Sequence, residues 1–225
     1  MTTLTLLAPS AGCLWHQQEK LPDLVAPLPL DRPPTPEPTE LPPDKAADAC
    51  LATARALERQ GHPAEAIAQY ERARQFNPKL IQVSRRLAVL YDQVGAFDLA
   101  LGEYKKALQH APRDAALLND VGYCHYQRGD LAEAEQWLRK AIAQDPKHTQ
   151  AWINLGLVLG QQRRYDESRE AFGKVLSPAE AHSNLGVILA QHGELAEAKA
   201  ACRQALALNP HLPQARIVLA RLEKE

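Results

Sequence analysis

Apolar side chains recur at spacings of three and four residues from about residue 47 onward, and the whole pattern returns every 34 residues. Such spacings place the apolar residues on one face of a helix. The repeat is clearest at small residues and prolines that fall one period apart: Ala66, Ala100 and Ala134, and Pro78, Pro112 and Pro146. Self-similarity at this period predicts stacked helix–turn–helix units, and therefore an all-α fold of the α-solenoid type.

About five units and one final helix account for residues 44–225. The units are predicted at 47–80, 81–114, 115–148, 149–178 and 179–212, followed by a capping helix at 213–225. Unit four is the exception, because Leu185-Gly186 returns only 30 residues after Leu155-Gly156. We expect its second helix to lose about one turn and the pitch of the stack to change there. The alternative is a neutral deletion at a unit boundary.

Small residues at a fixed place in every unit predict a close helix crossing. Position 8, counted from the start of each unit, holds Ala54, Ala88, Gly122, Gly156 and Gly186. A glycine near position 15 favours the turn between the helices, except in unit four, where Arg163 stands instead. Pro63 suits the first turn of a helix, and the segments Asp130–Glu133 and Ser177–Glu180 both match a capping box.

The first helix of unit four carries a family signature. It reads Trp152-Ile153-Asn154-Leu155-Gly156-Leu157-Val158-Leu159, which resembles the tetratricopeptide-repeat pattern W-x₂-L-G-x₂-Y with leucine in place of the tyrosine. The resemblance covers 47–212, and the chain is identified as a member of the tetratricopeptide-repeat (TPR) family. It implies that the first helices line a concave groove, which binds a peptide or a helix of a protein partner.

The resemblance also carries a set of groove residues over to this chain. They are Arg55, Arg85, Arg86, Asn119, Tyr123, Asn154 and Asn184. Asn154 and Asn184 both occupy position 6, where some family members stack asparagines that hold a peptide backbone, since an amide both donates and accepts hydrogen bonds. Alternatively, asparagine is merely common at this position. The arginines are expected to attract an acidic peptide or a C-terminal carboxylate.

The first 43 residues do not share the repeat. Residues 14–43 are dense in proline and are predicted to form a disordered, extended linker, because proline fixes φ and removes backbone donors. Residues 1–13, which include the run from Leu4 to Cys13, resemble a bacterial lipoprotein signal segment in which Cys13 is acylated. The segment departs from that pattern at Ser10, where leucine is usual, and it has no Lys or Arg near Met1. The alternative is a plain disordered tail.

Charge and composition exclude several classes of function. Lys plus Arg is 26 and Asp plus Glu is 27, which gives a net charge of −1, whereas binding to nucleic acid requires a basic face. No apolar run approaches the roughly 20 residues that span a bilayer, so contact with a membrane is expected only through an anchor at Cys13. The four cysteines form no CxxC pair, and no HExxH, GxSxG or Walker motif occurs.

The sequence therefore predicts a binding protein and not an enzyme. We expect no catalytic residues, cofactor, metal, nucleic acid or small-molecule substrate, and a protein or peptide as the partner. The favoured function is an interaction scaffold that is tethered to a bacterial cell envelope and aids assembly of an envelope complex. The alternatives are a cytoplasmic location and a role as an accessory or regulatory TPR subunit of a soluble enzyme or transferase.

Overall fold

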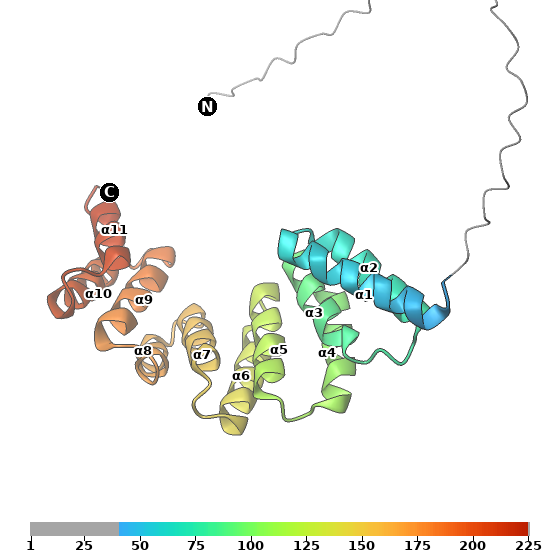
Figure 1. Cartoon of the computed structure of the whole chain (residues 1–225). Coiled ribbons are helices and arrows are strands. Elements are labelled where there is room, and N and C mark those ends of the chain that lie inside the picture. Colours follow the sequence, from blue (N-terminus) through green and yellow to red (C-terminus); the bar gives the residue numbers. More distant parts are fainter. Residues whose placement is uncertain (1–40, 225) are drawn as a thin grey trace, which may run out of the picture. The chain divides into compact units, whose positions relative to one another are not determined.

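The computed structural model describes residues 41–224, so the predictions for Cys13 and for most of the linker lie outside the described residues. Within this range the chain forms eleven helices and no strand (Figure 1). The helices are α1 Pro43–Gln60, α2 Pro63–Phe76, α3 Val83–Gln93, α4 Phe97–His110, α5 Ala115–Arg128, α6 Leu131–Gln144, α7 Thr149–Gln161, α8 Tyr165–Gly173, α9 Pro178–Gln191, α10 Leu195–Leu208 and α11 Pro213–Leu222.

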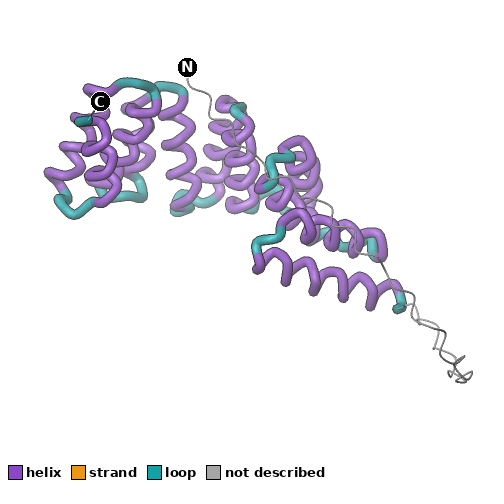
Figure 2. The backbone as a smooth tube through the Cα atoms, turned by 90° about the horizontal axis from the view of Figure 1, so that it is seen from above, coloured by secondary structure: helices purple, strands orange, loops and turns teal. Residues whose placement is uncertain are grey.

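The helices pack as five pairs followed by a single last helix. Each pair runs in chain order, from α1 with α2 to α9 with α10, and α11 packs on α9 and α10. The second helix of each pair also contacts the first helix of the next, so the pairs stack in chain order (Figures 1 and 2). This arrangement confirms the expected all-α solenoid with a terminal helix.

The two helices of a pair meet where position 8 faces position 24. A Cβ atom added to Gly156 would lie 2.6 Å from the Phe172 ring, and one added to Gly122 would lie 2.7 Å from Cγ of Leu138. Both facing side chains are fully buried. These distances are shorter than the van der Waals contacts of a packed interior. The close approach of the neighbouring helix therefore requires a small residue at position 8.

Four of the five turns between paired helices contain a glycine with positive φ, from 76° at Gly95 to 91° at Gly129. Arg163 takes the corresponding place in unit four and has φ 62°, the one non-glycine residue with positive φ among those described. A left-handed conformation costs an L-residue roughly 1–2 kcal/mol. The turn of unit four is thus the one that stores backbone strain.

The helix starts follow the predictions in part. Pro63 lies in the first turn of α2, and Ser177 and Glu180 form the expected capping box at α9. The predicted capping box at Asp130 is wrong, because its carboxylate makes no cap bond and instead pairs with Arg128 Nε at 2.9 Å. Helix α1 begins at Pro43, inside the predicted linker and ahead of unit one, because proline fits the first position of a helix.

Unit four is shortened as the sequence predicts. Helix α8 has nine residues, whereas α2, α4, α6 and α10 each have fourteen. The chain leaves α8 at Gly173 and reaches the cap of α9 at Ser177. The predicted change of pitch at this place remains a prediction.

Polar contacts join neighbouring units along the edge that carries the turns. They link Arg128 to Asp98 at 2.9 Å, Arg164 to Glu135 at 2.6 Å, Arg163 to Glu194 at 2.7 Å, and Gln162 Nε2 to the Leu131 carbonyl at 3.2 Å. The partners of each contact are 29 to 31 residues apart in sequence and belong to neighbouring units. They therefore fix one unit against the next, although each exposed ion pair contributes only about 0–1 kcal/mol.

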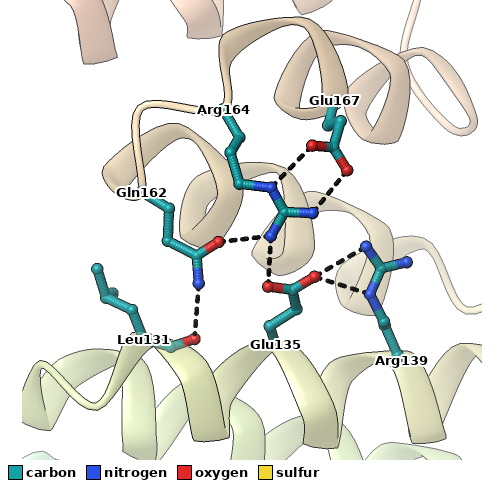
Figure 3. Close-up of polar contacts among 6 residues, drawn as sticks. All are labelled: Leu131, Glu135, Arg139, Gln162, Arg164 and Glu167. Carbon is teal, nitrogen blue, oxygen red and sulfur yellow. Dashed lines mark hydrogen bonds and ion pairs between the residues drawn. The ribbon is translucent and has the colours of Figure 1, made fainter.

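The most extensive network of these contacts lies between units three and four (Figure 3). The Arg164 guanidinium donates two hydrogen bonds to Glu167 and one, at 2.6 Å, to Glu135, which also accepts from Arg139 (Figure 3). Burial alone would raise the pKa of Glu135, but the hydrogen bonds from the two arginines outweigh burial and lower it. The ionised carboxylate is therefore the form that holds the two units together.

Replacing Gly156 by leucine should lower the free energy of unfolding by about 1–3 kcal/mol or more, because the new side chain would enter the Phe172 ring. The control is Gly102→Leu, at a helical position with no atom within 4 Å of an added Cβ. That change should stabilise by up to about 1 kcal/mol, since glycine is a poor helix former. Urea unfolding of both variants tests this, and equal midpoints would contradict the assigned register.

Candidate functional site

The first helices of the units form a row, and we term the surface made by their side chains the first-helix face. Helix α5 contacts both α3 and α7, and α9 contacts both α7 and α11. We number the junctions between consecutive first helices from one, between α1 and α3, to five, between α9 and α11. All seven residues carried over from the resemblance lie on α1, α3, α5, α7 or α9.

Junction one contains a hollow of about 430 Å³ with a basic lining. Arg86 donates to Glu58 Oε1 at 2.7 Å, and the Tyr70 hydroxyl donates to Oε2 of the same carboxylate at 2.6 Å. Burial, together with this carboxylate, raises the pKa of Tyr70. Arg55 and Arg59 also line the hollow and make no ion pair within residues 41–224. Three guanidinium groups thus line a hollow that contains one carboxylate, and that carboxylate is already bonded to Arg86 and Tyr70.

Junction two is acidic and partly buried. Arg85 donates to Asp114 and to Asp120, both at 3.1 Å, so its charge is balanced by two carboxylates. Burial raises the pKa of Asp120, against the opposing effect of Arg85, and burial likewise raises the pKa of Asp92. One carboxylate oxygen of Asp92 is buried without a hydrogen-bond partner. Arg85 therefore acts here as a brace between units two and three.

Junction three is closed by amides. Asn154, which is 3% exposed, donates from Nδ2 to Asn119 Oδ1 at 2.9 Å and accepts from Gln150 at 3.0 Å. Asn119 is itself 6% exposed. A peptide that reached the Asn154 amide would have to replace both partners. The half-buried ring of Tyr123 lies beside that of Tyr126, with 6.0 Å between their centroids.

Junction four leaves one predicted residue accessible. Asn184 is partly exposed, and its side chain makes no hydrogen bond within the described part of the chain. At the C-terminal end of α9, His192 is held through both ring nitrogens, by the Tyr165 hydroxyl and by Gln161 Oε1, each at 3.0 Å. Asn184 is consequently the position-6 asparagine that is free to meet a ligand.

Junction five holds a second hollow, of about 350 Å³, that the sequence reasoning missed. Its lining is mainly aliphatic: Val187, Ala190, Ile217, Val218 and Leu222, with Gln191 and Arg221 at the polar end. Ile217 lies on α11, and its side chain is 70% exposed. If the repeat numbering is continued from residue 213, Val218 falls at position 6, which is a groove position in the family. This signal in the sequence could have indicated the site.

The structure thus distributes the predicted residues and does not gather them into one pocket. Arg55 and Arg86 share junction one, Asn119 and Asn154 bond to each other, and Arg85, Tyr123 and Asn184 each lie at a different junction. Among residues 41–224 no group of three or more His, Cys, Asp or Glu is placed to hold a metal ion, and no helix is long and apolar enough to cross a membrane. Cys50, Cys124 and Cys202 are buried free thiols.

Stacked helix pairs with small residues at position 8 and a row of first helices are typical of a tetratricopeptide-repeat protein. Residues 32–225 match the sequence model of the family described as the cilia and flagella-associated protein 70 C-terminal domain, which is a TPR domain. The chain belongs to this TPR family. The membership inferred from the repeat is therefore confirmed.

Several known proteins resemble the chain. The type IV pilus assembly protein PilF of Pseudomonas aeruginosa is 31% identical over 136 residues, which are 59% of this chain and 54% of PilF. The structure of MamA matches with a TM-score of 0.60 and 21% identity, over 72% of this chain and 91% of MamA. The structure of YrrB, described as a TPR protein with an unusual peptide-binding site, matches with a TM-score of 0.57 and 20% identity, over 76% of this chain and 91% of YrrB. The two structures establish the fold alone. The chain spans about half or less of the length of the first curated relatives it matches.

The two position-6 asparagines should respond differently to truncation. Asn154→Ala is expected to destabilise by about 1–3 kcal/mol, because it leaves the buried Asn119 carbonyl without its donor. Asn184→Ala, at a partly exposed position, should stay within about 0.5 kcal/mol of the parent. Thermal or urea melts of the pair provide the measurement, and indistinguishable midpoints would refute the structural role of Asn154.

Proposed function

We propose that this protein is an interaction scaffold that binds a peptide or a helix of a protein partner on the first-helix face. The TPR fold supports the class, since its row of first helices offers an extended surface without a closed pocket. The observation that carries the proposal is the hollow at junction one. Arg55 and Arg59 line it without an ion pair from residues 41–224, and are available to an acidic group.

A guanidinium and a carboxylate form a charge-assisted and often bidentate pair, which contributes about 1.5–3 kcal/mol per bond when it is partly desolvated. Arg86 is held in place by Glu58 and so shapes the wall of the hollow. Tyr123 and Asn184 extend the surface from junction three to junction four, with an aromatic ring and a free amide. The partner segment we expect is therefore acidic and long enough to cover several junctions.

The test is a pull-down with the full chain from cells that express it natively, with quantification of the bound partner. The parent should retain a stoichiometric protein partner, and Arg55→Ala combined with Arg59→Ala should weaken its binding tenfold or more. Arg113→Ala, which removes an exposed arginine away from the hollow, is the matched control and should have no effect. Retention of full binding by the double variant would overturn the assignment of this surface, and a soluble enzyme as the partner would favour the accessory-subunit alternative.

We also propose that the protein is tethered to a bacterial envelope membrane through acylated Cys13 and aids assembly of an envelope complex. The support is the lipobox-like run that ends at Cys13, together with the similarity to PilF, a type IV pilus assembly protein. A linker of 30 residues between the anchor and the repeats would give the scaffold reach. A stable anchor requires more than one acyl chain.

Fractionation of cells producing the full chain, combined with intact-mass analysis, tests this anchor. The parent should appear in the membrane fraction with the mass of a diacylated or triacylated chain that starts at residue 13. Cys13→Ser should move the protein to the soluble fraction at its unmodified mass. Cys50→Ala changes the least buried of the described cysteines and should leave both readouts unaltered. An unmodified parent would rule out lipidation.

A further inference from the structure

The hollows at junctions one and five occupy the same place in the repeat. Each is lined by positions 9, 12 and 13 of one first helix and by position 6 of the next. In junction one these are Arg55, Glu58, Arg59 and Arg86. In junction five they are Val187, Ala190, Gln191 and Val218. One structural site thus occurs twice, with a basic lining at one end of the stack and an aliphatic lining at the other.

The aliphatic hollow is not explained by packing within the chain. Leu222 is 4% exposed and Ala215 fully buried, so α11 already covers the end of the last pair with these residues. Ile217 takes no part in that packing, because 70% of its side chain is exposed. A helix that served only to solubilise the end of a solenoid would carry a polar residue here. Exposed aliphatic side chains that line a concavity are typical of a ligand-binding site.

The charges at both hollows favour one kind of occupant. Arg55 and Arg59 are available at junction one, and Arg221 stands at the rim of junction five without an ion pair in the described chain. Between the two ends, Arg85 pairs with Asp114 and Asp120 and offsets one of their two charges, and the Asp92 carboxylate is buried. The first-helix face therefore presents unpaired positive charge to a ligand at each end.

We infer that one partner segment spans this face, with a carboxylate at junction one and an aliphatic side chain in the hollow of junction five. The inference rests on the proposed function and names the chemistry of its ligand. Axes of packed helices lie about 10 Å apart, and the backbones of α1 and α3 lie further apart than those of the other first helices, so the two hollows are at least about 40 Å apart along the row. An extended segment covers this distance with about 12 residues or more. Helix α11 is then part of the binding surface.

A library of random 16-residue peptides displayed on phage, selected against the full chain, tests the inference without knowledge of the partner. Enriched peptides should carry an acidic residue and an aliphatic residue about 12 or more positions apart. Against Ile217→Asp the aliphatic preference should disappear, and the best parental peptide should bind tenfold or more weakly by fluorescence anisotropy. Leu208→Asp changes a leucine that is 58% exposed but lies outside both hollows, and it should leave the preference and the affinity unchanged.

The outcomes separate the two proposals. Enriched peptides that require the acidic residue but not the aliphatic one, or equal affinity for Ile217→Asp, would overturn the inference and leave the proposed function intact. The absence of any enriched peptide would overturn both. Sedimentation of the parent and of Ile217→Asp adds a further check. A parental dimer that Ile217→Asp dissociates would show that a second copy covers the hollow, and the inference would fail.

Discussion

The contact between a nearly bare backbone at position 8 and the buried side chain at position 24 controls the packing of every helix pair. Where position 8 is glycine, a methyl group would collide with the facing Leu138, Phe172 or Cys202. In the first two units alanine takes this place, opposite the buried rings of Tyr70 and Tyr104. Since each pair is set by this one crossing, the first helices of successive pairs come to lie in a row. The first-helix face is the surface of that row.

The side chains on that face follow a progression along the row. Junction one is charged, junction two is an acidic cluster braced by Arg85, junction three is closed by the bonded amides of Asn119 and Asn154, and junction five is aliphatic. The same backbone site thus presents different chemistry at successive places. A regular scaffold with a non-uniform surface can distinguish both the sequence and the direction of a bound segment.

The sequence was sufficient to predict the helices, the turns, the shortened α8 and the small residues at the crossings, because each depends on residues within one unit. It was less informative about the binding residues. Asn154 sits where the family pattern places a ligand contact, but its amide is used by Asn119, one unit away. Arg85 bonds to Asp120, which lies 35 residues later in the chain. These hydrogen-bond partners come from a neighbouring unit, so they depend on how the units stack. The exposure of Ile217 likewise depends on which residues cover the end of the last helix pair.

Unit four combines two local weaknesses in one place. Its turn holds Arg163 in the left-handed region, and its second helix has only nine residues with which to pack against its neighbours. In a linear array the free energy of unfolding is the sum of a term for each unit and a term for each interface, so the least stable unit unfolds most readily. Local unfolding would begin in unit four and divide the stack of helices into two blocks, α1–α6 and α9–α11. Amide protons of α8 would then exchange faster than those of α6 or α10, and a ligand that bridges both blocks would slow them.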